Sequence, residues 1–140
     1  MGDSNSISIH IRRGDYVNNP KFAAVHGALP VTYYEKAMKL IEQRVDNPRY
    51  FLFSDDPEWA EEHISSRYKI DIVSGSNATE GEELSLMSLC KHHIIANSSF
   101  SWWGAWLNQK QDKIVIVPKQ WFVDPNRSMP DLIPGTWIQL

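Results

Sequence analysis

Short apolar segments alternate with helical patterns along the whole chain, and this alternation constrains the fold more than any other feature. Strands are predicted at 6–11, 50–53, 70–73, 93–96, 114–117 and 136–140. Helices are predicted at 32–45, 56–64 and 79–90, and from residue 98 onward. Most of the strand segments are short continuous apolar runs, which are typical of strands buried on both faces. The pattern predicts an α/β, Rossmann-like fold with a mainly parallel sheet and helices on both faces.

Three of the helices begin with recognisable start signals. Thr32 and Thr79 each precede a glutamate by three residues, which is the spacing of a capping box. Asp56 is followed directly by a proline, a combination typical of an N-cap and the first helical residue. We therefore expect these three side chains to cap helices.

Composition excludes several classes of protein. The chain has 140 residues, enough for one domain, and a formal net charge of −3, which argues against a general nucleic-acid binder. No apolar run approaches the length of a membrane span. The single cysteine, Cys90, excludes an intrachain disulfide, and we predict it to be a core residue. Three sequons, at 77–79, 97–99 and 126–128, are attributed to chance.

Polar side chains follow three of the predicted strands at the point where each strand ends. Arg12 and Arg13 follow the first strand, the segment 54–56 follows the second, and Ser98 and Ser99 follow the fourth. In parallel sheets of this kind ligands bind beyond the carboxyl ends of the strands. The three segments are therefore expected to converge on one ligand site.

The chemistry of this edge favours a phosphorylated ligand. Guanidinium groups such as those of Arg12 and Arg13 match phosphate oxygens and stay charged at any working pH. Gly14 beside them permits close backbone approach. Small hydroxyl residues at 98–101, where the last helix begins, suit an anion held by unpaired N–H groups.

Other polar residues have competing interpretations. His10 shares strand parity with Arg12, so contact with a base or ribose and a satisfied core histidine are equally favoured. Asp56 is most simply the N-cap, whereas Asp55 could accept a hydrogen bond from a ribose or a base. Glu83 is more simply a surface charge than a partner for a purine N–H edge. No Asp-x-Asp pattern is present, so no metal site is predicted.

Three tryptophans, Trp102, Trp103 and Trp106, lie within five residues of one another in the last predicted helix. They could form a platform on which sugars stack. At helical spacing such a cluster is more often part of the core, and we predict a core position for Trp103 and Trp106 in particular.

Four segments in order resemble the alpha-1,2-fucosyltransferases of glycosyltransferase family 11. The first, Ser-Ile-His-Ile-Arg-Arg-Gly-Asp-Tyr-Val at 8–17, is similar to that family's His-x-Arg-Arg-Gly-Asp-Tyr motif. The others lie at 53–57, 86–92 and 95–105. Each motif alone is moderately specific, but the ordered set is highly specific and covers nearly the whole chain.

The resemblance implies a two-domain enzyme of GT-B type that transfers fucose from GDP-fucose to a galactose 2-hydroxyl with inversion, without a metal. It implies that Arg12 and Arg13 bind the pyrophosphate and stabilise the leaving GDP. It implies that His10 and Glu83 contact the guanosine. The remaining residues that it assigns to the donor site are Asp55, Asp56, Ser98, Ser99 and Phe100.

Family members are about twice as long as this chain. Residues 1–140 are therefore expected to be a single GDP-fucose-binding domain, weakly active or inactive without the N-terminal, acceptor-side half that binds a galactose-terminated glycan. Asp15 is a weak candidate for the catalytic base. A bacterial cytoplasmic enzyme is expected, with membrane association of a longer parent left open.

The alternative is a non-catalytic module that binds carbohydrate or a nucleotide sugar. A P-loop kinase is disfavoured because the chain has no Gly-x-x-x-x-Gly-Lys-Ser/Thr run.

Overall fold

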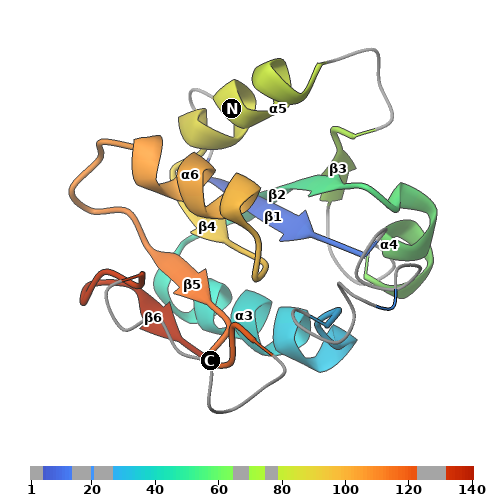
Figure 1. Cartoon of the computed structure of the whole chain (residues 1–140). Coiled ribbons are helices and arrows are strands. Elements are labelled where there is room, and N and C mark those ends of the chain that lie inside the picture. The colour runs from blue at the N-terminus through green and yellow to red at the C-terminus, as the bar shows by residue number, and fades with distance from the viewer. Residues whose placement is uncertain (1–4, 14–19, 21–26, 65–69, 75–78, 123–131) are drawn as a thin grey trace.

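The computed structural model describes residues 5–13, 20, 27–64, 70–74, 79–122 and 132–140. These residues form one six-stranded parallel sheet and four helices (Figure 1). The strands are β1 (Asn5–Ile11), β2 (Pro48–Ser54), β3 (Ile70–Ile72), β4 (His92–Ile94), β5 (Val115–Val117) and β6 (Ile138–Gln139). The helices are α3 (Val31–Arg44), α4 (Pro57–His63), α5 (Glu80–Leu89) and α6 (Ser99–Leu107). The predicted elements are all present, with ends that differ by at most two residues.

The strand order is β3-β2-β1-β4-β5-β6. The chain therefore builds outward from β1 through β2 to β3, and then returns to the other side of β1 to add β4, β5 and β6. Ile9 shows this central position, since it pairs with Leu52 of β2 on one side and with Ile94 of β4 on the other. The reversal between β1 and β4 is the topological switch point at which open α/β sheets bind ligands. The Rossmann-like prediction is confirmed in this respect.

Helices cover both faces of the sheet, as predicted. One face holds a large apolar cluster in which Ile7, Ile9 and Ile11 of β1 pack with α3. On the other face, Phe51 and Phe53 of β2 pack with α5, and a separate cluster involves α6. Figure 1 shows α5 and α6 lying side by side, apart from α3 and α4. Successive β1 residues alternate between these two environments, as the strand period requires.

The predicted caps are correct for two of the three helices. The Asp56 carboxylate accepts a hydrogen bond from the Trp59 N–H at 3.3 Å, and the Thr79 hydroxyl accepts one from the Glu82 N–H at 3.2 Å. The capping box at Thr32 is wrong. Helix α3 begins at Val31, with Pro30 at the N-cap and no side-chain cap, so Thr32 already lies inside the first turn.

Trp103 and Trp106 do not lie in the core, which corrects the prediction for both. They are 49% and 50% exposed. The buried face of α6 consists instead of small residues, because a side-chain carbon at Gly104 would come within 2.4 Å of the sulfur of Met87 on α5. Only Trp102 turns inward, where its indole N–H donates to the Leu132 carbonyl at 2.7 Å. Close contact between α5 and α6 thus forces the other two tryptophans outward.

The core prediction for Cys90 is confirmed: the residue is fully buried, and burial raises the pKa of its thiol to about 11. None of the helices in the described ranges is both long and apolar enough to cross a membrane.

Candidate functional site

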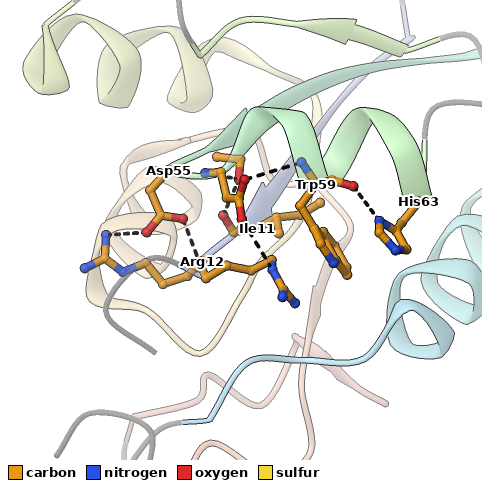
Figure 2. Close-up of polar contacts among 8 residues, drawn as sticks. Ile11, Arg12, Asp55, Trp59 and His63 are labelled. Atoms are coloured by element: carbon orange, nitrogen blue, oxygen red, sulfur yellow. Dashed lines mark hydrogen bonds and ion pairs between the residues drawn. The ribbon is translucent and has the colours of Figure 1, made fainter. Parts of the chain in front are cut away.

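Arginine and aspartate side chains meet where β1 and β2 end side by side. The Arg12 guanidinium lies 3.2 Å from one oxygen of the Asp55 carboxylate (Figure 2). The other Asp55 oxygen accepts a hydrogen bond from the Arg13 backbone N–H at 2.8 Å. Asp55 therefore fixes both the side chain of one arginine and the backbone of the next.

Arg13, which also lies just beyond β1, contacts different neighbours. Its guanidinium carbon lies 3.9 Å from the centre of the Trp59 ring on α4, and its Nε lies 3.7 Å from the Asp56 carboxylate. The Trp59 ring in turn stacks on His63 at 4.5 Å, and the His63 ring bonds to the Trp59 carbonyl (Figure 2). A cation over an indole face is attracted by the ring's negative charge density. Asp56 thus caps α4 and also helps to hold Arg13.

Ser54 locks the turn that carries both aspartates. Its hydroxyl donates to the Ile11 carbonyl at 2.8 Å and accepts from the Asp56 N–H at 2.9 Å. Its own N–H donates to the Ser74 hydroxyl at 2.7 Å. The sequence analysis placed Ser54 at the strand end but did not identify its role in the turn. It did not identify Trp59 or Ser74 as residues of the site. The sequence signal that could have pointed to Trp59 is its position three residues after the N-cap residue Asp56.

His10 is buried at the same edge without a complete set of hydrogen bonds. His10 is 5% exposed, and its Nδ1 has no hydrogen-bond partner among the residues that the structure describes. Its ring lies 5.2 Å from that of Phe100, and the Tyr34 hydroxyl donates to its backbone carbonyl at 2.9 Å. Burial, together with the nearby charge of Arg12, lowers the pKa of His10 to about 3. The imidazole is therefore neutral at physiological pH and can donate or accept a hydrogen bond, but it supplies no charge.

The start of α6 lies beyond the end of β4. Ser98 is its buried N-cap residue, Ser99 is exposed, and no side chain caps the helix. Asn97 is 1% exposed and donates to the carbonyls of Gly27 and Trp121, both at 3.1 Å. A glycan could not be attached to so buried an amide in the folded protein. Asn97 therefore has a structural role, in line with the assignment of the sequon at 97–99 to chance. The uncapped helix start leaves backbone N–H groups suited to an anion.

Contacts connect His10 with Phe100, and Arg12 and Arg13 with the two aspartates, but Glu83 stands apart. Glu83 is half-buried on the first turn of α5, where its N–H donates to the Thr79 carbonyl at 2.9 Å. No contact within the described part of the chain joins its side chain to the ends of β1 or β4. Gly14, Asp15 and the sequons at 77–79 and 126–128 fall wholly or partly outside the described residues.

Over the described ranges, no three His, Cys, Asp or Glu side chains form a group that could hold a metal ion. The charged groups that gather at this edge are two guanidinium groups and the carboxylates that orient them. Such a set can bind an anion and stabilise negative charge that develops on it.

The chain is similar to several known glycosyltransferases. The chain is 45% identical over 139 residues to the O-antigen biosynthesis glycosyltransferase WbnK of Escherichia coli, covering 99% of this chain and 45% of that protein. It is 40% identical over 144 residues to an alpha-1,2-colitosyltransferase of the same species, covering 98% of this chain and 48% of that one. It is 29% identical over 107 residues to galactoside alpha-(1,2)-fucosyltransferase 2 of Rattus norvegicus, covering 74% and 30% respectively.

The chain thus spans less than half the length of these relatives. No solved structure matches it. The profile of glycosyl transferase family 11 matches residues 1–140, the whole sequence. Together with the relatives, this match shows that the chain belongs to glycosyltransferase family 11.

Proposed function

We propose that this chain is the donor-binding domain of an inverting alpha-1,2-glycosyltransferase of GT-B type that uses GDP-fucose as its donor. The observation that carries the proposal is the convergence of Arg12, Arg13 and the uncapped start of α6 at the switch point of the sheet. The names of two of the relatives give an alpha-1,2 linkage but differ in the sugar, colitose or fucose, whereas the name of WbnK gives neither linkage nor sugar. We choose fucose because the motifs at 8–17 and 95–105 resemble those of the fucosyltransferases.

In this proposal the two arginines act on the leaving group. When the bond between the sugar C1 and the phosphate oxygen breaks, the electron pair stays on the diphosphate, which gains negative charge. Arg12 and Arg13 stabilise that charge, together with the N–H groups of residues 98–100. Preorganised donors of this kind contribute roughly 2.7–4 kcal/mol each to lowering a barrier. The acceptor 2-hydroxyl attacks C1 from the opposite side, which inverts the anomeric configuration, and no metal is required.

The guanosine is proposed to lie against His10 and Phe100. The unpartnered Nδ1 of His10 is a buried polar atom that costs free energy until a ligand satisfies it. Because the low pKa keeps this ring neutral, it contributes one directional hydrogen bond. Glu83 would reach the guanine N–H edge from α5.

Asp55 and Asp56 take a supporting role in this scheme. Both oxygens of Asp55 already have partners on residues 12 and 13, so we assign it to positioning the arginines instead of binding ribose. Asp56 aligns Arg13 and caps α4. Ser98 and Ser99 remain candidates for contact with the phosphates.

The acceptor is proposed to be a galactose-terminated glycan that binds with the help of an N-terminal half. This piece alone is then expected to transfer sugar weakly or not at all. The acceptor hydroxyl must lose its proton to a base, for which Asp15 remains the candidate from sequence.

Binding of GDP to the 140-residue chain tests the proposal. We expect GDP, but not ADP or free fucose, to shift the amide NMR signals of Arg12, Glu83 and Ser99. Arg12→Lys keeps the charge but loses the planar fork, and we expect it to weaken GDP binding by about tenfold or more. Arg49→Lys is the matched control, since Arg49 also pairs with an aspartate, Asp71, on this sheet.

Equal weakening by both lysine substitutions would contradict the assignment of Arg12. If GDP produces no shifts in a folded sample, the proposed donor site is absent from this half of the protein.

A non-catalytic carbohydrate-binding module is the second candidate, and the exposure of Trp103 and Trp106 favours it. Such a module does not need the arginine pair. It predicts that fucose or galactose changes the indole signals of these two residues and that Arg12→Lys leaves this response intact.

A further inference from the structure

A cavity of about 590 Å³ lies at the same edge of the sheet but away from the arginines. It is bounded by the segment before α3, the first turns of α3 and the segment after β5. Its volume falls within the range of small-molecule binding sites. None of the residues assigned above to the donor lines it.

The cavity has an apolar, partly aromatic wall and a polar rim. Tyr33 and Phe122, both largely buried, contribute the aromatic surface. The Tyr33 hydroxyl donates to the carbonyls of Ile95 and Ile116, at 2.7 and 3.2 Å, which fixes the ring beneath the ends of β4 and β5. An aromatic face beside hydrogen-bonding groups is the arrangement that suits a sugar ring, whose C–H face is apolar and whose edge is polar.

Two ammonium groups line the same cavity. Lys36 comes from α3 and Lys119 from the segment after β5, and neither side chain has an acidic or hydrogen-bonding partner within the described residues. By contrast, the Lys113 ammonium donates to the carbonyls of Ala105 and Asn108, and Arg49 pairs with Asp71. Two unpaired positive charges facing one cavity favour an anionic ligand.

The buried residue Asn97 links the wall of the cavity to the segment that leads into α6. Asn97 immediately precedes the start of α6, and its side chain donates to Gly27 at the cavity wall and to Trp121 beside it. In the strand order the proposed donor site at the ends of β1 and β2 and the cavity beyond the end of β5 therefore lie on either side of β4.

We propose that this cavity is an acceptor subsite that binds a negatively charged sugar unit, such as a hexuronate, next to the galactose that receives the transferred sugar. This inference rests on the proposed function for its role as an acceptor site. Binding of the charged sugar to the cavity is a separate property that can be measured alone.

The test is an amide NMR titration of the 140-residue chain with D-galacturonate and D-galactose, which differ only in the C6 carboxylate. We expect galacturonate to shift Thr32, Lys36, Lys119 and Gln120 and to bind about tenfold more tightly than galactose. Lys36→Ala and Lys119→Ala should each weaken galacturonate about fivefold and leave galactose unchanged. Lys39→Ala, an exposed lysine of α3 outside the cavity lining, is the control.

Three results would overturn the inference: no shifts at the cavity with galacturonate, equal affinity for the two sugars, or inorganic phosphate binding as tightly as galacturonate. GDP is titrated into the same samples. GDP binding without galacturonate binding rejects the subsite and leaves the donor proposal standing. Galacturonate binding without GDP binding rejects the proposed function and leaves a charged-sugar site.

Discussion

The two faces of β1 are both buried but differ in chemistry. Ile7, Ile9 and Ile11 point to one face and are fully buried in the apolar cluster with α3. Ser6, Ser8 and His10 alternate with them and are almost as deeply buried, yet all three are polar. One strand thus contributes apolar packing on one side and a row of buried hydrogen-bonding groups on the other.

The polar row is satisfied residue by residue until it reaches the ligand edge. The Ser6 hydroxyl accepts from the Lys91 N–H at 3.0 Å, and the Ser8 hydroxyl bonds to Nδ1 of buried His93 at 2.7 Å. Of these three side chains, His10 alone has a polar atom, Nδ1, without a hydrogen-bond partner in the described part of the chain. Polar burial serves structure at the amino end of β1 and, in our proposal, ligand binding at the carboxyl end.

The largest effect is expected on the apolar face. Ile9→Ala removes a fully buried side chain from the cluster and should lower the free energy of unfolding by about 2–5 kcal/mol. Ile9→Val, which retains most of the volume, should cost about 0.5–1.5 kcal/mol. Urea unfolding measures both. If the apolar face serves only packing, GDP affinity of the folded variants is unchanged, and a selective loss of GDP binding would break the distinction between the faces.

A pH dependence of stability is expected from the polar face. Burial lowers the pKa of both His10 and His93 to about 3, whereas the unfolded value is about 6.5. Below pH 6.5 the unfolded chain therefore binds protons that the folded chain does not. The free energy of unfolding should fall, by about 1 kcal/mol per pH unit for each histidine, as pH drops from 6.5 towards 5.

Urea unfolding at pH 7.5, 6.5 and 5.5 measures this loss. A stability that stays constant over this range would mean that the two buried rings are not neutral in the folded protein.

His10→Phe separates ligand binding from stability on the polar face. The change replaces an unsatisfied buried polar ring by an apolar one, so at pH 7 the folded state should be as stable as before or more stable by about 1 kcal/mol. GDP affinity should fall about tenfold, because a hydrogen bond to the ligand is lost. Calorimetry on the same sample measures both quantities. A clear loss of stability with unchanged GDP binding would make His10 a structural residue.

The smallest effect is expected from the ring that supports Arg13. Trp59→Leu removes the face over which the guanidinium lies and should weaken GDP binding by a few-fold, equivalent to about 0.5–1 kcal/mol. Trp59→Phe retains an aromatic face and should bind nearly as well as the unaltered protein. Isothermal titration with GDP distinguishes the two. Equal affinities of the two variants would show that the stacking contributes nothing to the site.

Sequence reasoning was most successful where local chemistry determines structure. Apolar periodicity located the strands β1 to β6 and the helices α3 to α6, and the caps at Asp56 and Thr79 follow from side chains only three residues from their partners. It failed for Trp103 and Trp106, because whether a tryptophan on α6 is buried depends on how closely α5 approaches, and Gly104 against Met87 sets that approach.

By itself the sequence determined the order of elements, the parallel sheet and the family, and it placed Arg12, Arg13, Ser98 and Ser99 at strand ends. Only the tertiary structure decided what each side chain does there. It pairs the two oxygens of Asp55 with residues 12 and 13, places Arg13 over the Trp59 ring, and leaves Nδ1 of His10 without a partner among the described residues. The physical reason is distance along the chain: strand and helix periods are local, whereas these contacts join residues that only folding brings together.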